Sequence, residues 1–176
     1  MELVGLTATL RPWRSSDAAS LVKYANNPNV ARQLRDRFPH PYTAADARHF
    51  IQSVANARPT TTFAISVAGE AVGGAGFAPG ADVERFSAEV GYWLGEPLWG
   101  RGITAEAVRL VSEYAFTRCN MLRLFALPFA DNLQSIRVLE KAGYTLEAIL
   151  RSSSVKHDTA RDQALYALVN AGWRGV

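Results

Sequence analysis

The chain has 176 residues, of which 48% are hydrophobic and 20% are charged, and its formal net charge at pH 7 is +3. These values predict a single globular domain over residues 1–176 and exclude an intrinsically disordered tail. The modest positive charge allows an acidic ligand such as a nucleotide. The chain lacks the dense run of Lys and Arg that indicates a nucleic-acid partner, so none is expected.

The cysteine and histidine content limits the chemistry further. Cys119 is the single cysteine, which excludes an internal disulfide and is typical of a reducing compartment. His40, His49 and His157 have no metal-ligand spacing with Cys119 or with each other, so no metal ion is expected. There is no apolar run of about 18 residues and no basic leader before an apolar segment. We therefore expect a cytoplasmic protein without a membrane partner.

Periodicity and turn residues predict alternating strands and helices along the chain. Strands are predicted over residues 6–11, 61–67, 71–77, 89–94, 122–127, 146–152 and 164–169. Helices are predicted from Ser15 or Ser16 to about residue 25, over 44–55 behind a Thr43/Asp46 capping box, from residue 103 onward, and over 133–141. Residues 32–42 and 78–86 are predicted as loops. This order predicts an α/β or α+β layer fold.

The stretch from residue 89 to residue 114 combines a strand, a glycine loop and a helix start. Gly95 and Pro97 end the strand, and the sequence Trp99-Gly100-Arg101-Gly102 follows before helical spacing begins. Two glycines let a ligand approach the backbone closely, and the free N–H groups of a first helical turn attract anions. The arrangement predicts a phosphate-binding site.

Three phosphate-binding patterns compete for this loop. The P-loop pattern G-x-x-x-x-G-K-[ST] does not occur, whereas Gly100 to Ala105 matches the dinucleotide pattern G-x-G-x-x-A. The third pattern, Q/R-x-x-G-x-G/A, is the pyrophosphate loop of the GNAT acetyltransferases. It falls on residues 99–104, with Trp99 and Thr104 departing from it at the two ends.

A second block supports the GNAT reading. Residues 132–144 follow the pattern N-x-x-S-x-x-x-x-x-K-x-G-F/Y, and W-G-x-G followed by E-A precedes them at residues 99–107. Together the two blocks resemble the RimJ/RimL-type branch of the GNAT superfamily, and the resemblance spans nearly the whole chain. It implies an α/β (α+β) fold of GNAT type, with a mixed, mostly antiparallel sheet flanked by helices and splayed central strands.

The resemblance also implies acetyl-CoA as the only cofactor. Its pyrophosphate would lie on the glycine loop, and its thioester would lie between the splayed strands. Arg101, Arg137 and Lys141 are candidate phosphate partners, although Arg137 and Lys141 are four apart and could equally form a solvated surface. The expected cofactor-binding residues are Trp93, Leu94, Gly100, Arg101, Gly102, Ile103, Thr104, Asn132, Arg137 and Lys141.

Glu89 is the candidate general base. It lies in a predicted central strand, in the opposite phase to Val90, and a carboxylate can take the proton of an acceptor amine directly or through water. The resemblance places a glutamate on this strand in that role. The alternative is an edge glutamate paired with Arg85 or Arg123.

Ser135 is the second candidate catalytic residue. It could donate a proton to the departing thiolate or hold the water that does so. Many GNAT enzymes have a tyrosine four residues later, where this chain has Leu139. The resemblance places Asn132 against the pantetheine arm. The alternative is that Asp131, Asn132 or Ser135 simply caps the following helix.

The sequence thus predicts an acetyl-CoA-dependent N-acetyltransferase that transfers the acetyl group directly to a primary amine. Backbone N–H groups near Trp93 or Leu94 would stabilise the oxyanion, and the amine would enter past residues 32–42 and 78–86. The acceptor could be a protein N-terminus or a small amine such as a polyamine or an antibiotic. A non-catalytic acyl-CoA-binding module and a nucleotide-dependent oxidoreductase remain as alternatives. We expect a monomer or a homodimer.

Overall fold

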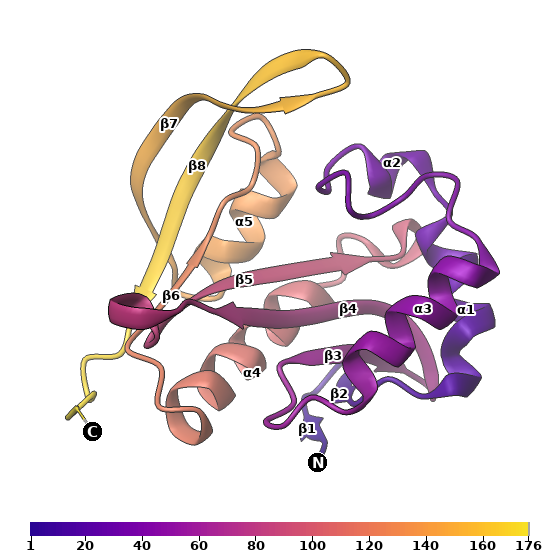
Figure 1. The fold of residues 1–176 in the computed structure, drawn as a ribbon, viewed down its shortest axis with the longest axis horizontal. Coiled ribbons are helices and arrows are strands. Elements are labelled where there is room, and N and C mark those ends of the chain that lie inside the picture. The colour runs from indigo at the N-terminus through magenta and orange to yellow at the C-terminus, as the bar shows by residue number, and fades with distance from the viewer. Residues whose placement is uncertain (176) are drawn as a thin grey trace.

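The computed structural model describes residues 1–175, which form one mixed eight-stranded sheet with helices on both faces (Figure 1). The strands are β1 (Leu3–Val4), β2 (Thr9–Arg11), β3 (Thr62–Val67), β4 (Glu70–Pro79), β5 (Ser87–Leu94), β6 (Arg123–Ala126), β7 (Thr145–Lys156) and β8 (Thr159–Val169). The helices are α1 (Ala18–Ala25), α2 (Pro28–Ala31), α3 (Ala44–Ala55), α4 (Ile103–Arg118) and α5 (Leu133–Lys141). Short 3-10 turns lie at Ser15–Asp17, Asp82–Glu84 and Glu96–Leu98.

The strands follow the order β1-β2-β3-β4-β5-β6-β8-β7 across the sheet. All neighbouring pairs are antiparallel except β5 and β6, which run parallel. The predicted mixed, mostly antiparallel sheet flanked by helices is therefore confirmed.

The sheet opens in its middle, between β5 and β6. Their pairing covers only three positions and ends at Glu89 opposite Phe125. Beyond this point β5 stays paired with β4 as far as Leu94, while β6 ends at Ala126. The second half of β5 therefore has a strand neighbour on one side only, which is the splayed arrangement that the sequence predicts.

Two apolar cores lie on the two faces of the sheet. Helices α4 and α5 pack on one face, where Val108, Val111 and Leu139 are fully buried. Helices α1 and α3 pack on the other, over a cluster that includes Trp13 and Leu21. Because both faces are covered, the central strands have a rigid position from which side chains can point into the opening.

Local sequence signals set several helix ends as predicted. Thr43 and Asp46 form a reciprocal capping box at the start of α3, which spans the predicted residues 44–55. The Asn132 side chain accepts the Ser135 N–H at 3.1 Å and caps α5, which spans the predicted residues 133–141. The capping alternative for Asn132 is therefore confirmed.

The strand predicted over residues 6–11 is shorter in the structure, where it is β2. It begins at Thr9, and Leu6 is 96% exposed. The reason lies on α4, where the Glu106 carboxylate accepts hydrogen bonds from the Leu6 N–H at 2.7 Å and the Thr7 N–H at 2.8 Å. These bonds hold the segment in a loop instead of a strand.

Other boundaries also differ from the sequence prediction. Helix α1 begins at Ala18, behind the 3-10 turn, and not at a serine cap. The predicted loop over residues 78–86 includes the end of β4 and a 3-10 turn. Strands β7 and β8 are longer than predicted and form a hairpin that rises from the sheet, with its tip on the side of α2 (Figure 1). No helix within residues 1–175 is long and apolar enough to cross a membrane.

Candidate active site

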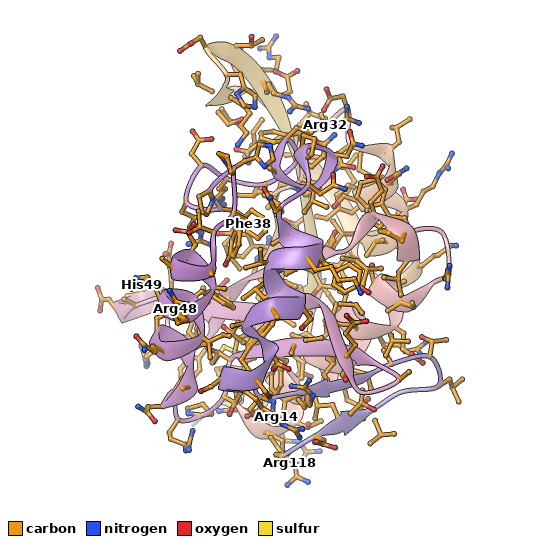
Figure 2. All side chains as sticks on the ribbon, turned by 90° about the vertical axis from the view of Figure 1, so that its right-hand side faces the viewer. Arg14, Arg32, Phe38, Arg48, His49 and Arg118 are labelled. Carbon is orange, nitrogen blue, oxygen red and sulfur yellow. The ribbon has the colours of Figure 1, made fainter. Side chains whose placement is uncertain are left out.

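A cavity of about 960 Å³ lies where β5 and β6 part. Its floor is formed by β4 and β5, and one wall by the end of β6 and by α5. The opposite wall is formed by α3 and by the α2–α3 loop (residues 32–43). Figure 2 looks onto the side of the molecule that carries this second wall and labels Phe38 in the loop and His49 on α3. The cavity thus has room for ligands that approach from two sides.

The glycine loop borders this cavity at the start of α4. Gly100 and Gly102 adopt left-handed φ angles of 78° and 79°, and a Cβ at either position would meet no other atom within 4 Å. Gly102 is the N-cap of α4, and no side chain caps that helix end within the described residues. The N–H groups of the first turn are therefore available to an anion beside an open backbone surface.

The backbone of β5 offers amide groups to the opening. The Gly95 N–H donates to the Val72 carbonyl on the β4 side at 2.8 Å. Because alternate residues of a strand direct their backbone groups to opposite sides, the Leu94 amide faces the β6 side. Its carbonyl there accepts the Trp99 indole N–H at 2.7 Å, which ties the loop to the strand. Of the two predicted oxyanion donors, the geometry favours Leu94 over Trp93.

The Trp93 side chain lies on the floor of the cavity, next to the wall formed by the α2–α3 loop. Its ring packs edge-on against Phe38, with centroids 5.5 Å apart, and Phe38 in turn lies 5.0 Å from Tyr42. The indole of Trp93 also lies over Gly74 on β4. The Trp93 side chain therefore contributes to an aromatic surface beneath the α2–α3 loop.

A smaller cationic hollow of about 270 Å³ lies on the outer side of the glycine loop. It is lined by the three cationic side chains of Arg101, Arg109 and Lys141, together with Gly102 and the buried carboxylate of Glu106. The Arg101 guanidinium donates to the Pro97 carbonyl at 3.1 Å. The structure thus brings two of the three predicted phosphate partners to one place.

Two predicted cofactor contacts lie elsewhere. The Arg137 side chain is exposed and lines neither this hollow nor the main cavity. The Ile103 side chain is buried in the core under α4, which leaves only its backbone N–H for a ligand. Thr104, the next residue, does line the main cavity.

Glu89 lines the cavity at the point where the strands separate. Its carboxylate forms an ion pair with Arg35 of the α2–α3 loop, and the two side chains are 28% and 48% exposed. Neither partner predicted by the alternative reading pairs with it. Arg123 binds Glu147 at 2.8 Å, and Arg85 donates to the Asp82 carbonyl. Arg35 is not predictable as its partner from the sequence, because nothing in the local pattern distinguishes it from other loop arginines.

Ser135 faces a tyrosine across the cavity. The Tyr92 hydroxyl lies 2.8 Å from the Ser135 Oγ. Leu139, at the position where many GNAT enzymes have a tyrosine, is fully buried in the core. A phenol therefore lies next to Ser135 but comes from β5 instead of α5. In the sequence, this phenol is visible only as a tyrosine in the strand that precedes the glycine loop.

The sequence model described as an acetyltransferase (GNAT) domain matches residues 8–145. The chain belongs to the GNAT acetyltransferase family. The predicted resemblance is confirmed, and the protein is an N-acetyltransferase enzyme. This finding excludes the non-catalytic acyl-CoA-binding module. The nucleotide-dependent oxidoreductase is also wrong, because a dinucleotide-binding fold needs a largely parallel sheet. Here β5 and β6 form the one parallel pair among residues 1–175.

Relatives of this GNAT protein support the assignment over most of its length. An uncharacterized N-acetyltransferase p20 of Bacillus licheniformis is 29% identical over 170 residues, which are 95% of either chain. The ribosomal-protein-serine acetyltransferase of Escherichia coli is 36% identical over 85 residues, about half of either chain. The structure of RimJ from Mycobacterium smegmatis, in complex with a CoA disulfide, has a TM-score of 0.78 and 25% identity. That match covers 92% of this chain and 81% of RimJ.

Metal-ligand clusters are absent from the described part of the GNAT chain. No group of three or more His, Cys, Asp and Glu side chains within residues 1–175 is placed to hold a metal ion. Cys119 is partly buried and burial raises the pKa of its thiol, which does not suit a nucleophile.

Proposed function

We propose that this GNAT enzyme uses acetyl-CoA to acetylate a primary amine by direct transfer, within a single domain over residues 1–176. The observation that carries the proposal is the opening of the sheet directly after Glu89, beside a glycine loop with an uncapped helix start. Two solved structures with the same fold contain the cofactor. One is a RimL in complex with coenzyme A, and the other is a microcin C7 self-immunity acetyltransferase in complex with acetyl-CoA and AMP.

The residues at the opening fit acetyl-CoA. The free N–H groups at the start of α4 suit a pyrophosphate, and the open surface at Gly100 and Gly102 allows its close approach. Arg101 and Lys141 add positive charge on the outer side of the loop. Asn132 uses its Oδ1 for the helix cap, which leaves its Nδ2 amide for the pantetheine arm.

Three groups of the chain then serve the reaction. Glu89 accepts the proton of the attacking amine, directly or through a water. The Leu94 N–H donates a hydrogen bond to the carbonyl oxygen of the acetyl group, where negative charge develops. Ser135, held by Tyr92, either passes a proton to the sulfur of the leaving coenzyme A and regains it from solvent, or holds the water that protonates this sulfur. The amine nitrogen forms the new bond to the acetyl carbon, and the carbon–sulfur bond breaks.

The acceptor is a protein N-terminus or a small amine. The ribosomal-protein acetyltransferases among the relatives and solved structures support the first class. The wall formed by α3 and the α2–α3 loop is the proposed acceptor surface, because the residues proposed to bind the cofactor lie on the other side of the opening. We further propose that the reaction needs no metal ion and that a monomer or a homodimer carries it out in the cytoplasm.

An acceptor screen tests this proposal. Acetyl-CoA is incubated with the enzyme and with N-terminal peptides, amino acids, polyamines or aminoglycosides, and release of free thiol is measured. Calorimetric titrations with acetyl-CoA and with NAD run in parallel. We expect acetyl-CoA to bind and NAD not to bind, with thiol release that depends on one class of amine and persists in a chelator. Binding of NAD alone, or chelator-sensitive turnover that zinc restores, would contradict the proposal.

A further inference from the structure

The α2–α3 loop is fixed across the acceptor side of the cavity by two ion pairs from adjacent residues. Arg35 pairs with Glu89 on β5, and Asp36 pairs with Lys156 at the tip of the β7–β8 hairpin, with 2.6 Å between Nζ and Oδ1. The Lys156 side chain is only 7% exposed, whereas that of Asp36 is 80% exposed. Because Lys156 binds Asp36, the backbone of the α2–α3 loop is held in a position that lets Arg35 reach the carboxylate of Glu89.

The charged and titratable side chains that face this part of the cavity come from three elements. The loop contributes Arg35 and Arg37, α3 contributes Asp46 and His49, and β5 contributes Glu89. The Asp46 carboxylate is already bound, since it accepts hydrogen bonds from the N–H and the hydroxyl of Thr43. Arg37 forms no ion pair with any of residues 1–175. Cationic groups are therefore available to an acceptor, and Glu89 is the carboxylate that lies where β5 and β6 part, at the proposed site of reaction.

The ion pair has a consequence for the reaction. The Arg35 guanidinium contacts one oxygen of the Glu89 carboxylate, Oε1, which leaves Oε2 for the amine. A guanidinium presents several N–H donors in a plane and binds a carboxylate best in a paired geometry. When the amine arrives, Arg35 is left beside it with donors to offer. A second carboxylate on the acceptor itself would satisfy them.

We infer that the acceptor carries a carboxylate within a few bonds of its amine, and that Arg35 binds this carboxylate while Glu89 receives the amine. The inference rests on the proposed function of Glu89 and narrows the class of substrate. It disfavours polyamines and aminoglycosides, whose several positive charges would lie next to Arg35 and Arg37. The carboxylate belongs either to a free α-amino acid or to the acidic first residue of a peptide.

The aromatic surface beside Arg35 suits an apolar group on the same acceptor. Phe38 packs between Trp93 and Tyr42, and Phe50 of α3 lines the same part of the cavity. A side chain of the acceptor can bury apolar area there while its two charged groups meet Arg35 and Glu89. Phenylalanine is therefore a suitable probe.

The experiment compares acceptors that differ only in the carboxylate. One pair is phenylalanine and phenylalanine amide, and the other is a C-terminally amidated tripeptide that begins with Asp or with Asn. Spermidine serves as the cationic acceptor. The kcat/KM of each is measured by thiol release at saturating acetyl-CoA, in the wild type and in Arg35→Gln. Because the intrinsic reactivity of each amine cancels in the ratio of wild type to variant, the ratios can be compared directly.

We expect Arg35→Gln to lower kcat/KM for the carboxylate acceptor at least tenfold more than for its neutral partner, in at least one of the two pairs. The acceptor pair in which this difference is found shows whether the natural acceptor is a free amino acid or a peptide. Arg35→Lys should give an intermediate ratio, since it keeps the charge without the paired donors. Arg118→Gln is the matched control. Arg118 is exposed at the end of α4, is labelled in Figure 2 and does not line the cavity, so its ratios of wild-type to variant kcat/KM should stay near one.

The outcomes separate the inference from the proposed function. The inference is overturned if the ratio of wild-type to Arg35→Gln kcat/KM is equal for the two members of both pairs, or if the wild type prefers spermidine. Either result leaves the proposed acetyltransferase reaction intact. Thiol release with none of the amines, by an enzyme that binds acetyl-CoA, contradicts the proposed function instead. Circular dichroism confirms that each variant is folded, and Arg35→Lys replaces Arg35→Gln if the latter is not.

Discussion

The Tyr92 hydroxyl lies 2.8 Å from the Oγ of Ser135 and 3.2 Å from the carbonyl oxygen of the same residue. The two residues come from β5 and α5, on opposite sides of the opening in the sheet. Burial raises the pKa of the Tyr92 hydroxyl above its ordinary value, so the phenol is protonated around neutral pH. Tyr92 therefore acts as a fixed hydrogen-bonding group that positions Ser135, and it does not titrate during the reaction.

Tyr92→Phe should lower kcat about tenfold at saturating acetyl-CoA and leave the affinity for acetyl-CoA within about threefold of wild type. Loss of one hydrogen bond near a reacting group costs about 1 to 1.5 kcal/mol. The effect should be absent in a Ser135→Ala background, because Tyr92 acts through Ser135. A double-mutant cycle on kcat measures this, and fully additive losses would show that Tyr92 has another role.

Gly102→Val should lower the affinity for acetyl-CoA at least about tenfold, or 1.4 kcal/mol. The new side chain would extend into the open surface at the start of α4 where the pyrophosphate is proposed to lie. Gly69→Val is the matched control, because Gly69 has a similar φ of 86° and open space, but lies in the β3–β4 turn. Calorimetry on both folded variants tests the prediction. Equal affinities of the two variants for acetyl-CoA would show that the glycine loop is not part of the binding site.

Glu89→Gln should lower kcat about a hundredfold to ten-thousandfold near pH 7. The glutamine keeps the size of the side chain but cannot accept a proton, so affinity for acetyl-CoA should change little. The loss should shrink as the pH rises, because more of the acceptor amine is then already neutral. The kcat of the variant with its preferred amine, measured from pH 6 to pH 9, tests this.

Glu147→Gln is the control for Glu89. Glu147 binds Arg123 with both carboxylate oxygens, which holds its pKa below the ordinary value, and it does not line the cavity. We expect its substitution to leave kcat within about threefold of wild type. If Glu147→Gln abolished turnover while Glu89→Gln did not, Glu147 would be the base and Glu89 a structural residue.

Glu106→Gln should lower the free energy of unfolding by about 1 to 3 kcal/mol at pH 7. The buried carboxylate accepts hydrogen bonds from Leu6 and Thr7, and an amide would place a donor against those donors. Glu113→Gln, an exposed position on the same helix, is the control. Urea unfolding of the two variants measures the difference, and equal midpoints would show that the contact contributes nothing net.

The contribution of Glu106 should also depend on pH. Burial raises the pKa of Glu106, but the hydrogen bonds from Thr7 and Leu6 outweigh it and hold the pKa below 4.5. Because the folded state binds the proton less readily than the unfolded state, the stabilisation is complete above about pH 4.5 to 5 and is lost as the pH falls through the lower folded pKa. The difference in stability between wild type and Glu106→Gln should therefore shrink from pH 5 to pH 3.

The sequence by itself determined the parts of this protein that depend on neighbouring residues. The Thr43/Asp46 capping box and the Asn132 cap set the ends of α3 and α5, because a cap acts on N–H groups two or three residues away. The glycine loop and the 132–144 block indicated the family for a similar reason. A phosphate-binding backbone needs its glycines and its helix start within a few residues of each other.

Only the tertiary structure decided which side chains meet at the opening. Arg35 is 54 residues from Glu89, Tyr92 is 43 from Ser135, and Lys156 is 120 from Asp36. Such pairs depend on where β5 and β6 part and on how the β7–β8 hairpin reaches the α2–α3 loop, and no local period encodes either distance. The sequence could therefore indicate a carboxylate beside a phosphate loop, but the arginine that faces that carboxylate emerged only from the folded chain.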